Sequence, residues 1–236
     1  MNVTLQLGEA HIARIEDYLG PSLETKVMFP GFRAAIWEAE QHWLAPMYFM
    51  PGGARLRTSH HSWLVKTPRH TVLIDACIGN NKTRTSPHFH MREGTWLDRL
   101  KDAGVSPEQV DFVMCTHLHA DHVGWNTRLR DGRWVPTFPN AQYLFSRIEF
   151  ERWDPRRPDY PPNAFNENVF VDSVLPVAEA GQMILVDDGH TVDDLLTIEA
   201  APGHTKGHVR FRLRSGDREG RFCGDILHHP IQIPYP

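Results

Sequence analysis

The chain contains 236 residues, with 25 basic and 29 acidic side chains and a formal net charge of −4. This length suits one large domain with a sizeable core, and the acidic balance provides no basic surface for nucleic acids or other polyanions. Three cysteines without CxxC spacing predict buried free thiols and argue against a disulfide framework.

The sequence contains no uninterrupted apolar run of 18 residues, and its first eight residues lack the basic flank and apolar core of a signal peptide. It also contains no internal repeat and no low-complexity linker. We therefore expect a soluble, cytoplasmic protein, with residues 1–236 in a single domain and no membrane or nucleic-acid partner. The composition leaves the oligomeric state open.

The first part of the chain predicts a helix followed by strands. Apolar residues recur at helical spacing over residues 31–44, which indicates a helix packed on the fold or over a pocket. Strands are predicted at 55–58, 61–66 and 71–75. Asp75 ends the last of these strands, and its carboxylate should hold a neighbouring loop through hydrogen bonds.

Helix signals recur in the middle of the chain. Residues 95–104 begin with a capping threonine and end with glycine, which predicts a short helix. Ser146 should cap a helix over 147–153, and the four prolines that follow should make 154–162 a loop beside a pocket. The other predicted segments are a turn at 131–132 and strands at 110–115, 141–145, 195–201 and 220–227.

A histidine-rich motif, Thr116-His-Leu-His-Ala-Asp-His-Val-Gly124, follows the strand at 110–115 directly. Alternation of side chains along an extended segment places His117 and His119 on one face, about 6.6 Å apart, where both can bind one metal ion. Asp121 and His122 lie past the strand end and can face a second ion beside the first. A surface histidine cluster without a metal is the alternative interpretation.

Two later segments supply further ligand types. The strand at 195–201 leads to His204, which we predict as the third ligand of the first metal. Asp225 follows a glycine within the last predicted strand, and its two carboxylate oxygens could bridge two cations. His208 should orient a ligand by hydrogen bonding, without binding the metal itself.

These segments resemble the metallo-β-lactamase-fold hydrolases. The resemblance is carried by residues 116–124, 203–208 and 224–225, together with Ser62-Trp-Leu-Val65 and Val72-Leu-Ile-Asp-Ala76, and it runs from about residue 60 to residue 230. It implies an α/β fold, a four-layer αββα sandwich with the metals at one edge. The implied ligands are His117, His119 and His204 for the first zinc, Asp121 and His122 for the second, and Asp225 between them.

The resemblance is nearest to the lactonase and organophosphate-hydrolase branch. Members that reduce oxygen or nitric oxide carry glutamate where this chain has His119, and many β-lactamases carry cysteine where it has Asp225. The implied function is hydrolysis of a small ester or lactone by a zinc-activated hydroxide, with Asp121 orienting the water and passing on its proton. Phosphotriester or β-lactam hydrolysis at the same site, or a catalytically impaired metal-binding fragment, are the alternatives.

The chain departs from the family pattern after Asp225. Family members normally supply one more histidine to the second metal and then a last helix, whereas eleven residues follow Asp225 here. The resemblance therefore predicts a sandwich that is incomplete at the C-terminus. His228 and His229 could replace the missing ligand, but a place at the pocket rim is the stronger expectation for both.

Overall fold

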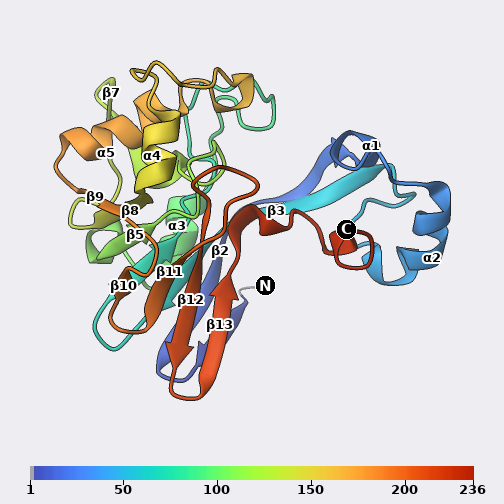
Figure 1. The fold of residues 1–236 in the computed structure, drawn as a ribbon, viewed down its shortest axis with the longest axis horizontal. Coiled ribbons are helices and arrows are strands. Elements are labelled where there is room, and N and C mark those ends of the chain that lie inside the picture. The colour runs from blue at the N-terminus through green and yellow to red at the C-terminus, as the bar shows by residue number, and fades with distance from the viewer. Residues whose placement is uncertain (1–2) are drawn as a thin grey trace. The chain divides into compact units, whose positions relative to one another are not determined.

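The computed structural model describes residues 3–236, which divide into two compact units (Figure 1). The first unit contains the chain up to Asp17 and residues His61–Ile226, and the second contains Tyr18–His60 and Leu227–Pro236. Strands β2 (Ala10–Glu24) and β3 (Arg55–Lys66) each begin in one unit and end in the other. That residues 1–236 make a single domain stays a prediction.

The strands form one large and one smaller sheet plus a hairpin. The larger sheet has the order β1-β2-β3-β4-β5-β8-β9, and the neighbours from β4 to β9 pair in parallel. The smaller sheet, β10-β11-β12-β13, is antiparallel. The remaining bounds are β1 (Thr4–Leu7), β4 (Thr71–Ile74), β5 (Phe112–Met114), β6 (Thr127–Arg130), β7 (Arg133–Pro136), β8 (Gln142–Ser146), β9 (Met183–Val186), β10 (Thr191–Val192), β11 (Leu196–Ala200), β12 (Val209–Ser215) and β13 (Arg218–Phe222).

The two sheets bury a shared apolar core in the first unit. Alternate residues of each strand contribute, because side chains along a strand point to opposite faces. The contributors include Val72 and Ile74 from β4, Leu144 from β8, and Phe211 and Leu213 from β12. Parallel strands buried on both faces need continuous apolar sequence. The runs at 71–74 and 112–114 meet this requirement.

Helices of the first unit cover the other face of the larger sheet. Tyr143 of β8 is fully buried and contacts Phe138, which in turn packs edge-on against Trp96 of α3 (Trp96–Asp102). Helix α4 (Arg147–Trp153) starts directly after β8. The fold is thus mixed α/β, as predicted. The other short elements of this unit are α5 (Leu175–Glu179), the 3₁₀ turns η1 (Pro107–Gln109), η2 (Gly124–Asn126), η3 (Ala164–Asn166) and η5 (Gly224–Ile226), and the π-helical turn η4 (Phe170–Val174).

The second unit has its own small aromatic core. Its helices are α1 (Thr25–Met28) and α2 (Ala34–Leu44), and η6 (Pro230–Gln232) belongs to its C-terminal segment. Leu44, Phe49, Leu56 and Ile231 are buried together. The helix predicted over 31–44 therefore forms, and it packs in this core.

Several predicted segments differ from the observed ones. The strands expected at 55–58 and 61–66 are one continuous strand, β3. The segment 220–227 does not remain extended, because β13 ends at Phe222 and Asp225 lies in the turn η5. Ser146 occupies the N-cap position of α4 without a side-chain capping hydrogen bond. Cys223 is exposed, whereas the thiols of Cys77 and Cys115 are free and buried as expected.

Over residues 3–236, we find no helix with the length and apolar character needed to cross a lipid bilayer.

The fold brings three loops together where strands end. Strand β5 ends at Met114 just before the histidine-rich motif, and β11 ends at Ala200 before the segment with His204. The backbone N–H of Val209 donates to the Thr116 carbonyl (2.9 Å), so the two loops are joined directly. The N–H of Ala76 likewise donates to the His122 carbonyl (2.6 Å).

Candidate metal centre

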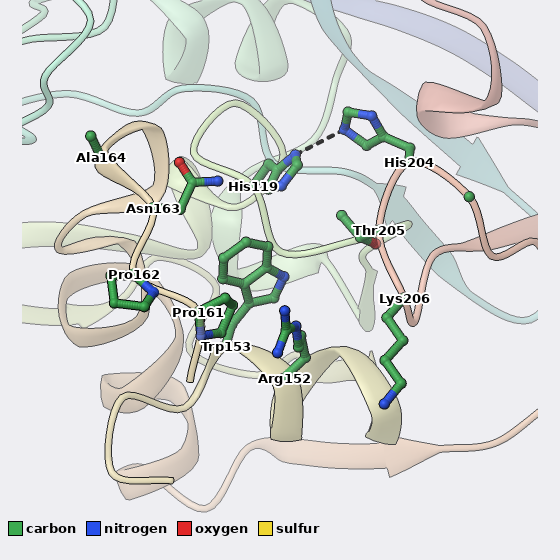
Figure 2. Close-up of a pocket in the computed structure, with 11 residues that line it drawn as sticks. His119, Arg152, Trp153, Pro161, Pro162, Asn163, Ala164, His204, Thr205 and Lys206 are labelled. Carbon is green, nitrogen blue, oxygen red and sulfur yellow. Dashed lines mark hydrogen bonds between the residues drawn. The ribbon is translucent and has the colours of Figure 1, made fainter. Parts of the chain in front are cut away.

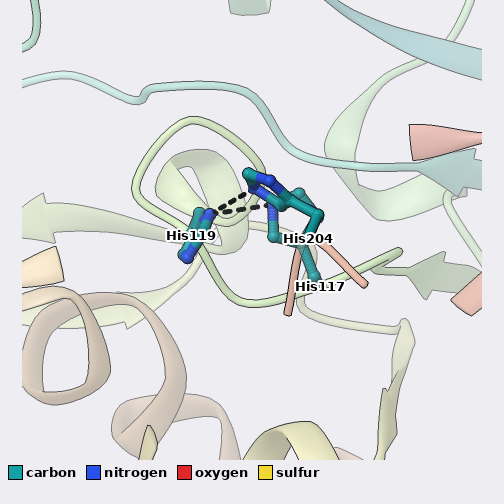
Figure 3. Close-up of side chains that lie close together, drawn as sticks. All are labelled: His117, His119 and His204. Atoms are coloured by element: carbon teal, nitrogen blue, oxygen red, sulfur yellow. Dashed lines mark hydrogen bonds between the residues drawn. The ribbon is translucent and has the colours of Figure 1, made fainter. Parts of the chain in front are cut away.

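Three histidine side chains converge on one point (Figure 3). The Nδ1 atom of His119 lies 3.1 Å from Nε2 of His117 and 2.9 Å from Nε2 of His204. Two ligands bound to a tetrahedral zinc at about 2.0–2.1 Å lie roughly 3.3 Å apart, so these separations are close to what one ion needs. Residues 116–119 are irregular, not extended, and the rings of His117 and His119 are 4.6 Å apart between centroids.

Burial favours the neutral form of two of these imidazoles, His117 and His119. Burial lowers the pKa of His117 well below its usual value and that of His119 to about 4. Neutral imidazole is the form that binds a metal, because the lone pair is then free. The His204 side chain is 21% exposed, so solvent reaches the group from that side. The three nitrogens therefore fit a cation.

A second group forms around Asp225 and His122, adjacent to the first. One Asp225 oxygen, Oδ1, lies 3.2 Å from His122 Nε2, and the other, Oδ2, lies 3.5 Å from His204 Nε2. The two oxygens thus face different histidines, as bridging of two ions requires. Asp121 lies nearby, with Oδ1 3.9 Å from His122 Nε2.

His122 differs from the other histidines in its electrostatic surroundings. Burial lowers its pKa, but the carboxylates of Asp225, Asp75 and Asp121 outweigh burial and hold the pKa well above its usual value. His122 Nδ1 lies 2.9 Å from Asp75 Oδ2, which leaves Nε2 directed at Asp225. The negative charge gathered here is the charge that a bound cation would balance.

Asp75 supports the histidine-rich loop through hydrogen bonds, as its position at the end of a strand predicts. It accepts hydrogen bonds from the Thr116 backbone N–H (2.7 Å) and from the Thr116 hydroxyl, and it pairs with His122. Its backbone is left-handed, with φ of 58°. One carboxylate therefore fixes both the start of the histidine-rich loop and the ring of His122.

His208 forms a hydrogen bond with the backbone of Asp225. Its Nε2 accepts a hydrogen bond from the Asp225 backbone N–H (3.0 Å). Gly224 permits this close approach: a Cβ there would lie 2.7 Å from His208 Nε2 and 2.8 Å from the Thr116 side chain. The glycine before Asp225 is therefore required by packing as well as by its φ of 53°.

His229 is engaged within the second unit. Its Nε2 lies 3.1 Å from the Tyr48 carbonyl, and its Nδ1 accepts from the Ile231 N–H (3.2 Å). The ring packs edge-on against Phe49 at 4.7 Å between centroids. Both ring nitrogens are therefore already used, which argues against His229 as a replacement ligand. The neighbouring His228 donates its backbone N–H to Gln232 (2.8 Å).

A cavity of about 570 Å³ opens beside His119 and His204 (Figure 2). Trp153 forms one wall and contacts the His119 ring edge-on at 5.3 Å between centroids. Part of the proline-rich loop borders the cavity, as predicted, through Pro161 and Pro162. The complete lining consists of His119, Arg152, Trp153, Pro161, Pro162, Asn163, Ala164, Gly203, His204, Thr205 and Lys206.

Sequence reasoning missed two side chains that hold the loops of the site. Glu149 of α4 accepts from the backbone N–H groups of Leu118 and Gly207, and Asn166 donates to the Leu118 carbonyl. A glutamate in the first turn of a predicted helix gave no signal, since acidic residues are common there for electrostatic reasons.

Comparison with known proteins identifies the family. Residues 55–236 match the family model described as the metallo-beta-lactamase superfamily. The N-acyl homoserine lactonase AttM of Azorhizobium caulinodans is 29% identical over 170 residues, which cover 64% of this chain and 58% of that protein. The match to AttM of Rhizobium johnstonii spans 41% of that relative's length.

Solved structures agree in fold. AidC, a dizinc quorum-quenching lactonase solved with the product N-hexnoyl-L-homoserine, superposes with a TM-score of 0.72 at 22% identity, over 96% of this chain and 75% of AidC. The hydrolase AbOPH of the beta lactamase superfamily gives 0.73 at 26% identity, over 96% of this chain and 74% of AbOPH. With the family model matching most of the chain, we conclude that this protein belongs to the metallo-beta-lactamase superfamily.

Proposed function

We propose that this chain hydrolyses small lactones or esters with two zinc ions. His117, His119 and His204 would hold one ion, Asp121 and His122 the other, and Asp225 would bridge them. The observation that carries the proposal is the convergence of three histidine nitrogens beside a carboxylate whose two oxygens face different histidines. Nitrogen and carboxylate ligands without thiolate suit zinc in a hydrolytic site.

The residues of the site would have different roles in the reaction. When bound, the ions lower the pKa of water towards about 7 and polarise the carbonyl under attack. Asp121 would orient the attacking water and carry its proton on a carboxylate oxygen to the leaving alkoxide. Asp75 keeps His122 Nδ1 occupied, so that only Nε2 is available as a ligand.

The size and lining of the cavity are consistent with a small substrate that has an acyl portion. Its volume lies within the usual range for small-molecule sites. Trp153 and the prolines at 161–162 offer apolar walls close to His119, while Arg152 and Lys206 offer hydrogen-bond donors. The lactonase names of AttM and AidC agree with such a substrate.

Metal titration combined with a substrate panel tests the proposal. The chain, stripped with a chelator and dialysed against zinc, should retain two ions by elemental analysis. It should then release acid from N-hexanoyl homoserine lactone in a pH-stat. An aryl ester, a phosphotriester and a β-lactam complete the panel and separate the competing substrate classes.

His117→Ala should lower the zinc content and abolish hydrolysis together, because it removes a ligand of the first ion. His190→Ala is the matched control, since His190 is exposed and lies outside the candidate site. Unchanged zinc content in His117→Ala would contradict the ligand assignment. Zinc binding without turnover of any panel substrate would contradict the hydrolase proposal and favour a metal-binding fragment.

A further inference from the structure

Glu149 is a fully buried carboxylate in the first turn of α4. Its Oε1 accepts from the backbone N–H of Leu118 (3.3 Å) and from the indole N–H of Trp153 (2.9 Å). Its Oε2 accepts from the backbone N–H of Gly207 (3.0 Å). An ionised carboxylate is costly to bury, and hydrogen bonds from several N–H groups offset this cost.

Two of the three donors to Glu149, the backbone N–H groups of Leu118 and Gly207, belong to loops that carry candidate metal ligands. Leu118 separates His117 from His119, and Gly207 lies within the segment that carries His204. The two oxygens of one side chain therefore attach to two loops that are distant in sequence. Both loops carry ligands of the same proposed ion.

The packing around these contacts leaves little freedom. A Cβ at Gly207 would lie 2.4 Å from the Glu149 backbone nitrogen and 2.8 Å from the Ile148 carbonyl carbon, so this loop rests directly on α4. On the other loop, Asn166 donates to the Leu118 carbonyl (3.0 Å) while Glu149 binds the Leu118 N–H. Both polar backbone groups of Leu118 are thereby fixed.

We propose that Glu149 is a positioning residue that holds the two histidine loops at the separation required by one metal ion. The inference rests on the zinc site proposed above. A carboxylate is suited to this task because it accepts on both oxygens and donates on neither. Glutamine in its place would direct an N–H group at one of the two backbone N–H donors and would release that loop.

Glu149→Gln tests the proposal without an activity measurement. We expect zinc affinity, measured by competition with a chromophoric chelator, to fall about 10- to 100-fold, the scale typical of residues that orient metal ligands. The visible absorption of the cobalt-substituted protein should also change, because it reports ligand geometry. Glu149→Asp keeps the charge but shortens the reach, and it should lose less affinity than Glu149→Gln. It also carries the test if the glutamine variant does not fold.

Leu100→Ala in α3 is the matched control, since Leu100 is fully buried and makes no contact described for the site. It should lower the melting temperature and leave zinc affinity and the cobalt spectrum unchanged. If both Glu149 variants also lowered the melting temperature but left zinc affinity and the cobalt spectrum unchanged, the positioning role would be overturned and Glu149 would have a structural role only. Absence of zinc binding by the wild-type chain would instead overturn the proposed function, and this inference with it.

Discussion

The three aspartates near the histidines differ in the partners that surround them. Asp75 directs its oxygens at Thr116 and at His122 Nδ1, so none is left for a metal. Asp225 directs its two oxygens at Nε2 atoms of His122 and His204. Asp121 lies farther off, 3.9 Å from His122 Nε2. The same side-chain type thus has different neighbours at each position, which is why we propose a supporting role for Asp75, bridging for Asp225 and proton transfer for Asp121.

Asp121→Asn should slow hydrolysis more than it weakens folding. The amide keeps the shape of the side chain but cannot take a proton from the attacking water, so we expect kcat to fall about 10²-fold, the scale of a lost general acid or base. Steady-state kinetics at saturating zinc, together with the melting temperature, checks this. Turnover at the wild-type rate would exclude Asp121 from proton transfer.

At the scale of elements, the sequence predicted those loops and helices whose conformation is set by residues nearby in the chain. The histidine-rich loop follows a short apolar strand and could be recognised from spacing alone, as could helix α4 between Ser146 and the prolines. Strand β2, fifteen residues long, was not predicted, because exposed and buried residues alternate imperfectly along it. The role of Glu149 could not be predicted either, since its partners are brought to it only by folding.

Two loops of the site contact each other through the backbones of Gly79 and Gly124. This contact predicts how much the methyl group of an alanine there would destabilise the protein. A Cβ at Gly124 would lie 1.8 Å from the Ile78 carbonyl oxygen, and one at Gly79 would lie 2.6 Å from the Gly124 carbonyl carbon. Gly124→Ala must therefore displace backbone, and we expect a loss of about 1–3 kcal/mol or more in the free energy of unfolding.

Denaturant unfolding of Gly124→Ala and of Gly31→Ala measures this difference. Gly31 has no atom within 4 Å of its added Cβ, so its substitution should change stability by less than about 0.5 kcal/mol. Equal stability of the two variants would show that the backbone at Gly124 shifts to admit a Cβ without loss of stability, which would contradict the prediction.

At the scale of the whole molecule, one buried lysine should link stability to pH. Lys82 is fully buried, donates to Thr127 (2.6 Å) and to the Asp172 carbonyl (3.0 Å), and lies 3.6 Å from the Asp172 carboxylate. Arg84 binds the same carboxylate. Burial lowers the pKa of Lys82 to about 7, although Asp172 opposes the shift.

The sign of the pH effect follows from which state binds the proton. Between pH 7 and about 10.4, the ordinary lysine pKa, the unfolded chain keeps the Lys82 proton while the folded chain releases it. The Lys82 contribution to stability therefore rises with pH across this window and is constant below it. Lys82→Met removes the effect, so the stability difference between variant and wild type should be most favourable to the variant at pH 7 and should shrink towards pH 10. Urea unfolding of both proteins across this range measures it, and a constant difference would contradict the lowered pKa.

The proposed ligands come from parts of the chain that are far apart, His119 and His204 being separated by 85 positions. An ion bound by both would act as a cross-link between the loop after β5 and the loop after β11, and so between the two sheets. A clip that closes so long a loop removes much of the conformational freedom of the unfolded chain. The histidines that we propose as zinc ligands would then also raise the free energy of unfolding of the chain.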